Sequence, residues 1–127
     1  MNINYIKIIA VSGALCVGLG AFGAHGLKEH ITPELLESFK TAVNYHMFHT
    51  LAMGLVFLLG AGGYITSPKF ICNLFVIGII CFSGSLYGMA FANYFGASLK
   101  WLGPITPIGG LFFIAAWLML TFKTIKK

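Results

Sequence analysis

FICNLFVIGIICFSGSLYGMAFANYFGASL, residues 70–99, is a continuous apolar stretch that contains no charged side chain. Its length exceeds the about 20 residues that an α-helix needs to cross the hydrocarbon core of a bilayer. Apolar residues occur on all sides of it, whereas transmembrane β-strands are about ten residues long and alternate in polarity. The stretch therefore predicts a transmembrane helix, in which every backbone polar group is bonded within the segment.

Three further uncharged runs have the same character, and charged residues separate them. They cover residues 8–27, 41–68 and 101–122. We therefore predict one all-α integral membrane domain over residues 1–127. It is a bundle of four transmembrane helices with spans at about 5–26, 41–61, 70–95 and 105–123.

The composition agrees with lipid as the surrounding solvent. The 127-residue chain is 58% hydrophobic and 9% charged, whereas about a quarter of the residues in a soluble domain are charged. The net charge of +5 comes from scattered lysines without any arginine, which is not typical of nucleic-acid binding. Three cysteines without a CxxC pair predict small core residues rather than a metal or disulfide framework, and we predict no cofactor.

Prolines mark the beginning of two helices. Thr32-Pro33-Glu34 supplies a capping hydroxyl, a proline for the first turn and an acid near the positive end of the helix dipole. The following segment, 33–41, either lies on the membrane surface as a short interfacial helix or continues into the second span. Thr106, which precedes Pro107, is predicted to cap the fourth span.

The distribution of lysines predicts the orientation in the membrane. Four spans place both termini on one side, together with Lys7, Lys69, Lys123, Lys126 and Lys127. The other side holds Lys28, Lys40 and Lys100 and all three acids, Glu29, Glu34 and Glu37. The positive-inside rule then places both termini in the cytoplasm.

Small residues recur at every fourth position in two spans. Such a stripe allows another helix to approach closely, so we predict helix–helix contacts along both stripes, within the chain or between chains. A bundle of four helices has little interior, which favours a homo-oligomer, although packing without further purpose is the simpler interpretation. The stripes are Ala10, Ala14 and Gly18 in the first span and Gly84, Gly88, Ala92 and Gly96 in the third.

Most polar side chains within the spans are expected near the outer leaflet. The first and third spans end on that side, and the second and fourth begin there. Polar groups at membrane depth usually face the interior of the bundle, where they find partners. The candidate polar site consists of His25, Tyr45, His46, His49, Tyr87, Asn93 and Thr106.

The chemistry open to this site is limited. His46 and His49 stand three residues apart, so both imidazoles can project from one helical face. A metal would need a third ligand from His25 or His30, and structural hydrogen bonding is the commoner role, so we predict no metal. No acid within the spans completes a catalytic triad, and the GxSxG elbow is absent. We therefore expect a protein that is not an enzyme.

Four stretches occur in a fixed order: LGAFGAHGL at 19–27, TAVNYHMFHTLA at 41–52, FSGSLY at 82–87 and ITPIGG at 105–110. With them the chain resembles the domain of unknown function 423 family, small bacterial inner-membrane proteins related to the eukaryotic transmembrane protein 256. The resemblance implies an uncharacterised, multi-pass plasma-membrane protein. Members often have Tyr-Gln where this chain has Tyr45-His46. The resemblance thus implies that a His46–His49 metal pair is not a property of the whole family. It makes His25, Tyr45 and His49 the better candidates for a functional role.

Two functions compete. A small binding or transport protein would use the outer polar cluster for a small polar ligand, an ion or a lipid headgroup, and it would have an outward-facing polar cavity. A structural or assembly protein would use the same residues to bond helices together, in a closed bundle without a pocket. We prefer the first, although the residues specify no particular ligand, and we expect the lipid bilayer as the first partner.

Overall fold

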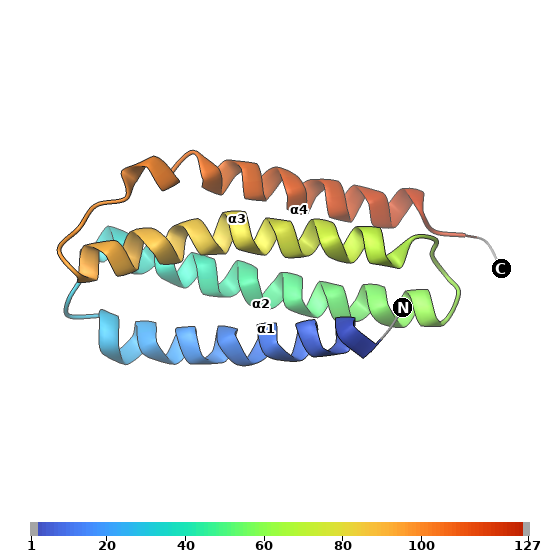
Figure 1. The fold of residues 1–127 in the computed structure, drawn as a ribbon, viewed down its shortest axis with the longest axis horizontal. Helices are drawn as coiled ribbons and strands as arrows, with labels where there is room; N and C mark the ends of the chain where they lie inside the picture. The colour runs from blue at the N-terminus through green and yellow to red at the C-terminus, as the bar shows by residue number, and fades with distance from the viewer. Residues whose placement is uncertain (1–2, 126–127) are drawn as a thin grey trace.

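The computed structural model describes residues 3–125, which form four long helices joined by short connections (Figure 1). Their bounds are α1 (Ile3–Phe22), α2 (Pro33–Ala61), α3 (Pro68–Tyr94) and α4 (Ile105–Phe122). A π-helical turn, η1 (Gly23–Leu27), extends α1, and a 3-10 turn, η2 (Lys100–Leu102), precedes α4. All four helices are long and apolar enough to cross a membrane, so the predicted bundle of transmembrane helices is confirmed.

The helices alternate in direction, and their order in space follows their order in the chain. In Figure 1, α2 and α3 lie between α1 and α4, and the first and last described residues lie at the same end. We call this end, which includes the α2–α3 connection, the termini end, and the opposite end the loop end. The α1 helix packs mainly on α2, and α4 packs mainly on α3.

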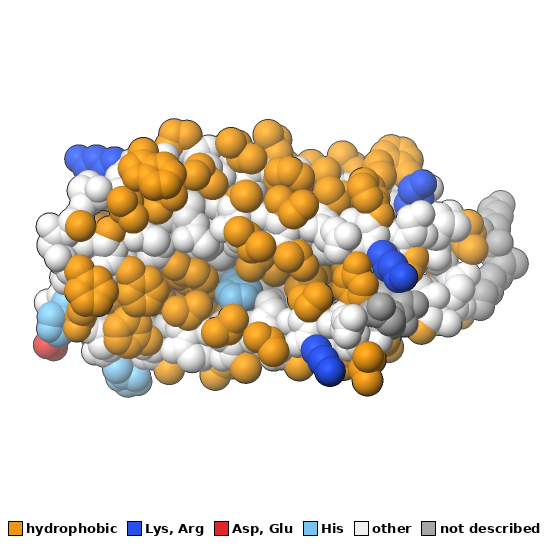
Figure 2. Space-filling model, viewed as in Figure 1, with side chains coloured by type: hydrophobic (Ala, Val, Ile, Leu, Met, Phe, Trp, Pro, Cys, Tyr) orange, Lys and Arg blue, Asp and Glu red, His pale blue; other side chains and the backbone are white. Residues whose placement is uncertain are grey.

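The exterior of the bundle is apolar over most of its length (Figure 2). Large side chains such as Phe48, Leu111 and Val17 expose about two thirds of their surface. Basic side chains lie toward both ends of the view in Figure 2, and the middle carries mainly hydrophobic side chains, with a histidine among them. Such a surface suits lipid chains at mid-depth and headgroups at the ends.

The alternatives for residues 33–41 are decided in favour of a continuous second span. The α2 helix begins at Pro33, and the Thr32 hydroxyl accepts a hydrogen bond from the Leu35 N–H at 3.3 Å. Phe39 is fully buried against Leu27 and Ala90. This burial fixes the segment within the bundle and not on the surface of the membrane.

The predicted cap of the fourth span is wrong. The α4 helix begins at Ile105, and its N-terminal flanking residue is Pro104, which makes no side-chain capping bond. Thr106 therefore lies inside the first turn. Its hydroxyl lies 2.5 Å from the hydroxyl of Ser85 on α3, so it joins two helices instead of ending one.

The predicted small-residue stripes are only partly used within the chain. Ala92 is buried, and Gly88 faces Leu102 closely. Gly96, in contrast, lies beyond the end of α3 with φ +77°, where it ends the helix as the Ala97 N–H bonds the Ala92 carbonyl at 2.7 Å. Gly96 therefore makes no close approach to another helix within residues 3–125, and a contact with a second molecule stays a prediction.

The stripe on the first helix lies on the exposed surface of the described residues. Ala10, Ala14 and Gly18 are exposed, and an added Cβ at Gly18 would meet nothing within 4 Å. A contact between these residues and a second molecule stays a prediction.

The helices α3 and α4 approach each other closely at Gly109, outside the predicted stripes. A Cβ atom added to this buried glycine would collide with the backbone of Phe82. About one helical turn further along both helices, a Cβ added to Gly78 of α3 would collide with the ring of Phe113 on α4. Two glycines, one on each helix, thus set the distance between α3 and α4.

We predict that Gly109→Ala destabilises the protein by about 1–3 kcal/mol, because the added methyl group forces the two helices apart. The measurement is thermal unfolding of the detergent-purified protein. Gly110→Ala is the matched control, since its Cβ would only reach ordinary contact with Phe82 at 3.9 Å. Equal melting temperatures for the two variants would contradict the close approach.

Candidate functional site

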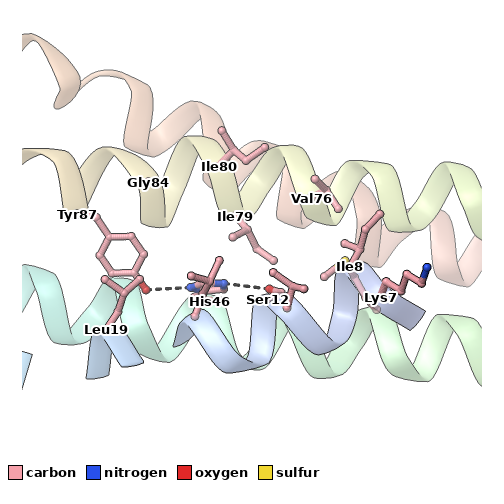
Figure 3. A pocket seen from close by; sticks show the side chains of 13 residues that line it. Lys7, Ile8, Ser12, Leu19, His46, Val76, Ile79, Ile80, Gly84 and Tyr87 are labelled. Atoms are coloured by element: carbon pink, nitrogen blue, oxygen red, sulfur yellow. Dashed lines mark hydrogen bonds between the residues drawn. The ribbon is translucent and has the colours of Figure 1, made fainter. Parts of the chain in front are cut away.

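A groove runs along the bundle between α1 and α3, with α2 as its floor (Figure 3). Its volume is about 570 Å³, and apolar side chains such as Val11 and Leu15 of α1 and Ile79 of α3 form its walls. Gly84 leaves part of the α3 wall without a side chain. The groove opens sideways, toward the region that lipid occupies in a membrane.

Contacts between α1 and α3 close the groove at both ends. At the termini end, the Tyr5 hydroxyl donates a hydrogen bond to Asn73 Oδ1 at 3.0 Å. At the loop end, the rings of Phe22 and Phe91 stack with their centroids 5.7 Å apart. Between these two contacts α1 packs mainly on α2, and the groove is open along its side.

His46 lies in the floor of the groove and joins three helices. Its Nε2 lies 3.0 Å from Ser12 Oγ on α1, and its Nδ1 lies 3.0 Å from the Tyr87 hydroxyl on α3. Ser12 Oγ is also 2.6 Å from Thr50 Oγ1, which in turn donates to the His46 carbonyl at 2.8 Å. Figure 3 shows Tyr87, His46 and Ser12 in one row along the groove, joined by hydrogen bonds.

One arrangement of protons satisfies every donor in this row. The Thr50 hydroxyl donates to the His46 carbonyl, so Ser12 donates to Thr50. The imidazole N–H at Nε2 then donates to Ser12, and the Tyr87 hydroxyl donates to Nδ1. A neutral imidazole with its proton on Nε2 fits these partners, since it has one donor and one acceptor nitrogen.

His49 joins α2 to α4 on the opposite side of the bundle. The indole N–H of Trp117 can only donate, so His49 Nε2 accepts it at 3.3 Å. Nδ1 then donates to the Tyr45 carbonyl at 2.6 Å. The ring also lies flat on Phe113, with centroids 3.5 Å apart. Both nitrogens of this imidazole are occupied by the fold itself.

The seven residues predicted as one polar site do not share a cavity. His46 and Tyr87 line the groove, while Tyr45 stacks on Phe82 at 4.4 Å, toward the α4 side. The others lie elsewhere: His49 against Trp117, Thr106 against Ser85, Asn93 in a separate cleft of about 290 Å³ at the loop end, and His25 exposed in η1. Residues 3–125 contain no group of three His, Cys, Asp or Glu residues able to hold a metal.

The depth of the histidines also differs from the prediction. Because α2 has 29 residues and begins at Pro33, His46 and His49 lie on either side of its midpoint and not near its outer end. Ser12 and Thr50, which complete the row, were not predicted as site residues. An antiparallel pairing of the first two spans around the turn at 28–32 brings Ser12 opposite His46. This register could have been derived from the sequence, and it would have predicted the contact between the two residues.

We predict that Trp117→Phe destabilises the protein by about 1 kcal/mol, because it leaves the buried Nε2 of His49 without its donor. Thermal unfolding measures the loss, and Trp101→Phe, an exposed tryptophan in η2, is the control. The same loss is expected with and without added Zn²⁺. The opposite result would be that Zn²⁺ raises the melting temperature of the wild type and that Trp117→Phe changes this rise. It would indicate that His49 binds a ligand.

The comparisons with known proteins agree with the membrane fold. A family model described as "Protein of unknown function (DUF423)" matches residues 19–110. The chain is 40% identical over 125 residues to the UPF0382 membrane protein SH2409 of Staphylococcus haemolyticus, covering 95% of this chain and 98% of the relative. It is also 40% identical over 127 residues to the UPF0382 membrane protein YwdK of Bacillus subtilis, covering 96% of each chain.

The similarity extends to a eukaryote. The UPF0382 membrane protein C1782.12c of Schizosaccharomyces pombe is 40% identical over 112 residues, covering 87% of this chain and 92% of the relative. No solved structure matches the chain. The resemblance inferred from the four sequence stretches is confirmed, and the chain belongs to the DUF423 family of membrane proteins, whose function is unknown.

Proposed function

We propose that this protein is a binding protein of the plasma membrane and that the groove between α1 and α3 holds the hydrocarbon chain of a membrane lipid. The groove itself is the observation that supports this function. Its volume of about 570 Å³ lies within the range of small-molecule sites, about 300–1,000 Å³. Its walls are apolar, and it opens to the side where lipid chains lie.

The dimensions of the groove favour a single chain. Lys7 and Leu19 both line it, and the helix between them rises about 18 Å. Half of the hydrocarbon core is about 15 Å thick. A chain that enters at the headgroup level of the termini end would therefore reach just past the middle of the membrane.

The polar side chains of the floor favour an apolar ligand over the polar one that the sequence suggested. His46, Ser12 and Thr50 bond one another, and His49 is bonded on both nitrogens. A small polar ligand would have to break these bonds in a medium without water, which is costly. For the same reason we propose binding and not catalysis.

The cytoplasmic placement of both termini belongs to this proposal. Lys7, Lys69 and Lys123 lie at the termini end, and all three acids of the sequence lie at the loop end. Positively charged residues near membrane segments favour the cytoplasmic side.

The alternative is a structural or assembly protein. One observation favours it: Ala10, Ala14 and Gly18 form an exposed small-residue surface on α1, the kind of surface on which transmembrane helices associate. In that case the hydrogen bonds of His46 and His49 would serve only to hold the helices together.

We predict that Gly84→Leu removes a lipid that the wild-type protein retains through purification. Gly84 lines the groove, and a Cβ there meets only the Ile79 carbonyl at 3.9 Å, so the new side chain can start toward the groove without a backbone clash. Native mass spectrometry of the protein released from detergent measures the retained lipid.

Gly18→Leu is the matched control, because Gly18 is also an unobstructed helix glycine but lies outside the groove. It is expected to retain the lipid. If the alternative holds, Gly18→Leu instead shifts the protein from oligomer to monomer while Gly84→Leu changes nothing. Equal lipid retention by wild type and Gly84→Leu would contradict the groove as a binding site.

A further inference from the structure

We infer that the lipid in the groove is an anionic phospholipid of the leaflet at the termini end, with one chain between α1 and α3 and its phosphate beside Lys7. The inference rests on the proposed function and adds the class of ligand. The position of Lys7, the charge at this end of the molecule and the contacts that close the groove support it.

Lys7 is the charged residue of the groove lining, and it lies at the termini end of the groove. Figure 3 shows its side chain directed along the groove toward that end, away from His46. Among residues 3–125 the one ion pair joins Lys40 and Glu37, so Lys7 has no carboxylate partner there. A lysine at this depth extends its ammonium group toward the headgroups.

The surroundings of Lys7 favour an anion. Lys69 and Lys123 lie at the same end, whereas Glu29, Glu34 and Glu37, the three acids of the sequence, lie at the other. Within residues 3–125, no Asp or Glu side chain at this end therefore competes for Lys7. Basic residues between helices at the membrane surface are a recurrent site for the headgroups of anionic lipids.

The closure at the termini end supplies further polar groups for a phosphate. Asn73 accepts the Tyr5 hydroxyl through Oδ1, which leaves its amide N–H groups as donors at an exposed position. Lys69 lies one turn from Asn73 along α3, on the same side of the helix. Asn73 and Lys69 thus add polar groups from α3 at the same end of the molecule as Lys7.

The same contacts argue against a protein helix as the occupant. Tyr5–Asn73 and Phe22–Phe91 bridge α1 and α3 at the two ends. A transmembrane helix about 30 Å long and about 10 Å wide would have to break both bridges to lie in the groove. A flexible hydrocarbon chain fits between them.

The test compares phosphatidylglycerol with phosphatidylcholine that carries identical chains, using native mass spectrometry to measure their relative affinities for the purified full chain. Phosphatidylglycerol should bind about five-fold more tightly than phosphatidylcholine. This is the difference in affinity that the attraction between one lysine and an anionic lipid headgroup produces. Lys7→Gln should abolish this preference while still binding both lipids. Lys7→Arg should keep the preference, and Lys100→Gln, at the loop end, should leave it unchanged.

The outcomes separate this inference from the proposed function. If both lipids bind the wild type equally, or palmitate displaces phosphatidylglycerol, the inference is overturned while the groove remains a lipid site. If inorganic phosphate alone raises the melting temperature in a Lys7-dependent way, the site is one for free anions, which also overturns the inference. If no lipid binds, the proposed function fails with it.

Discussion

One imidazole, that of His46, joins three of the four helices. It contacts Ser12 on α1 and Tyr87 on α3 from its place on α2, and Thr50 completes the row. In the middle of a membrane no water is present to take over these hydrogen bonds, so each polar group must find its partner within the protein. The row therefore fixes how α1, α2 and α3 lie relative to one another.

The groove is a consequence of this arrangement. Ser12 and His46 hold α1 down on α2, while Gly84 gives α3 no side chain to fill the space beside it. On the far side, glycines let α3 and α4 approach closely and His49 bonds Trp117. The α3–α4 half of the bundle is thus tightly packed, and the other half has the apolar groove along its side. The lipid chain that we propose would lie on the open side, across α3 from the closely packed α3–α4 pair.

Much of the fold, but little of the site, was predictable from the sequence. Uncharged runs of at least about 20 residues sufficed for the four helices, because the thickness of the bilayer fixes the length of a span. The site depends on the rotation of each helix about its own axis and on the depth of its residues along the bundle. The hydropathy of the sequence determines neither. Thr106, which was expected to cap the fourth span, faces Ser85 instead. Gly96, which was expected in a packing stripe, follows the end of α3. The contact between His49 and Trp117 joins two helices that are not consecutive in the chain, so no hairpin register could predict it.

The most direct test of the account is to place a photoreactive diazirine amino acid at Ile80, which lines the groove, and to identify by mass spectrometry what it captures in intact cell membranes. Ile114 on α4 is a control of similar exposure, 57% against 64%. The account predicts a phospholipid adduct at Ile80 in clearly higher yield than at Ile114. Equal yields at both positions, or a protein adduct at Ile80, would contradict a lipid-binding groove.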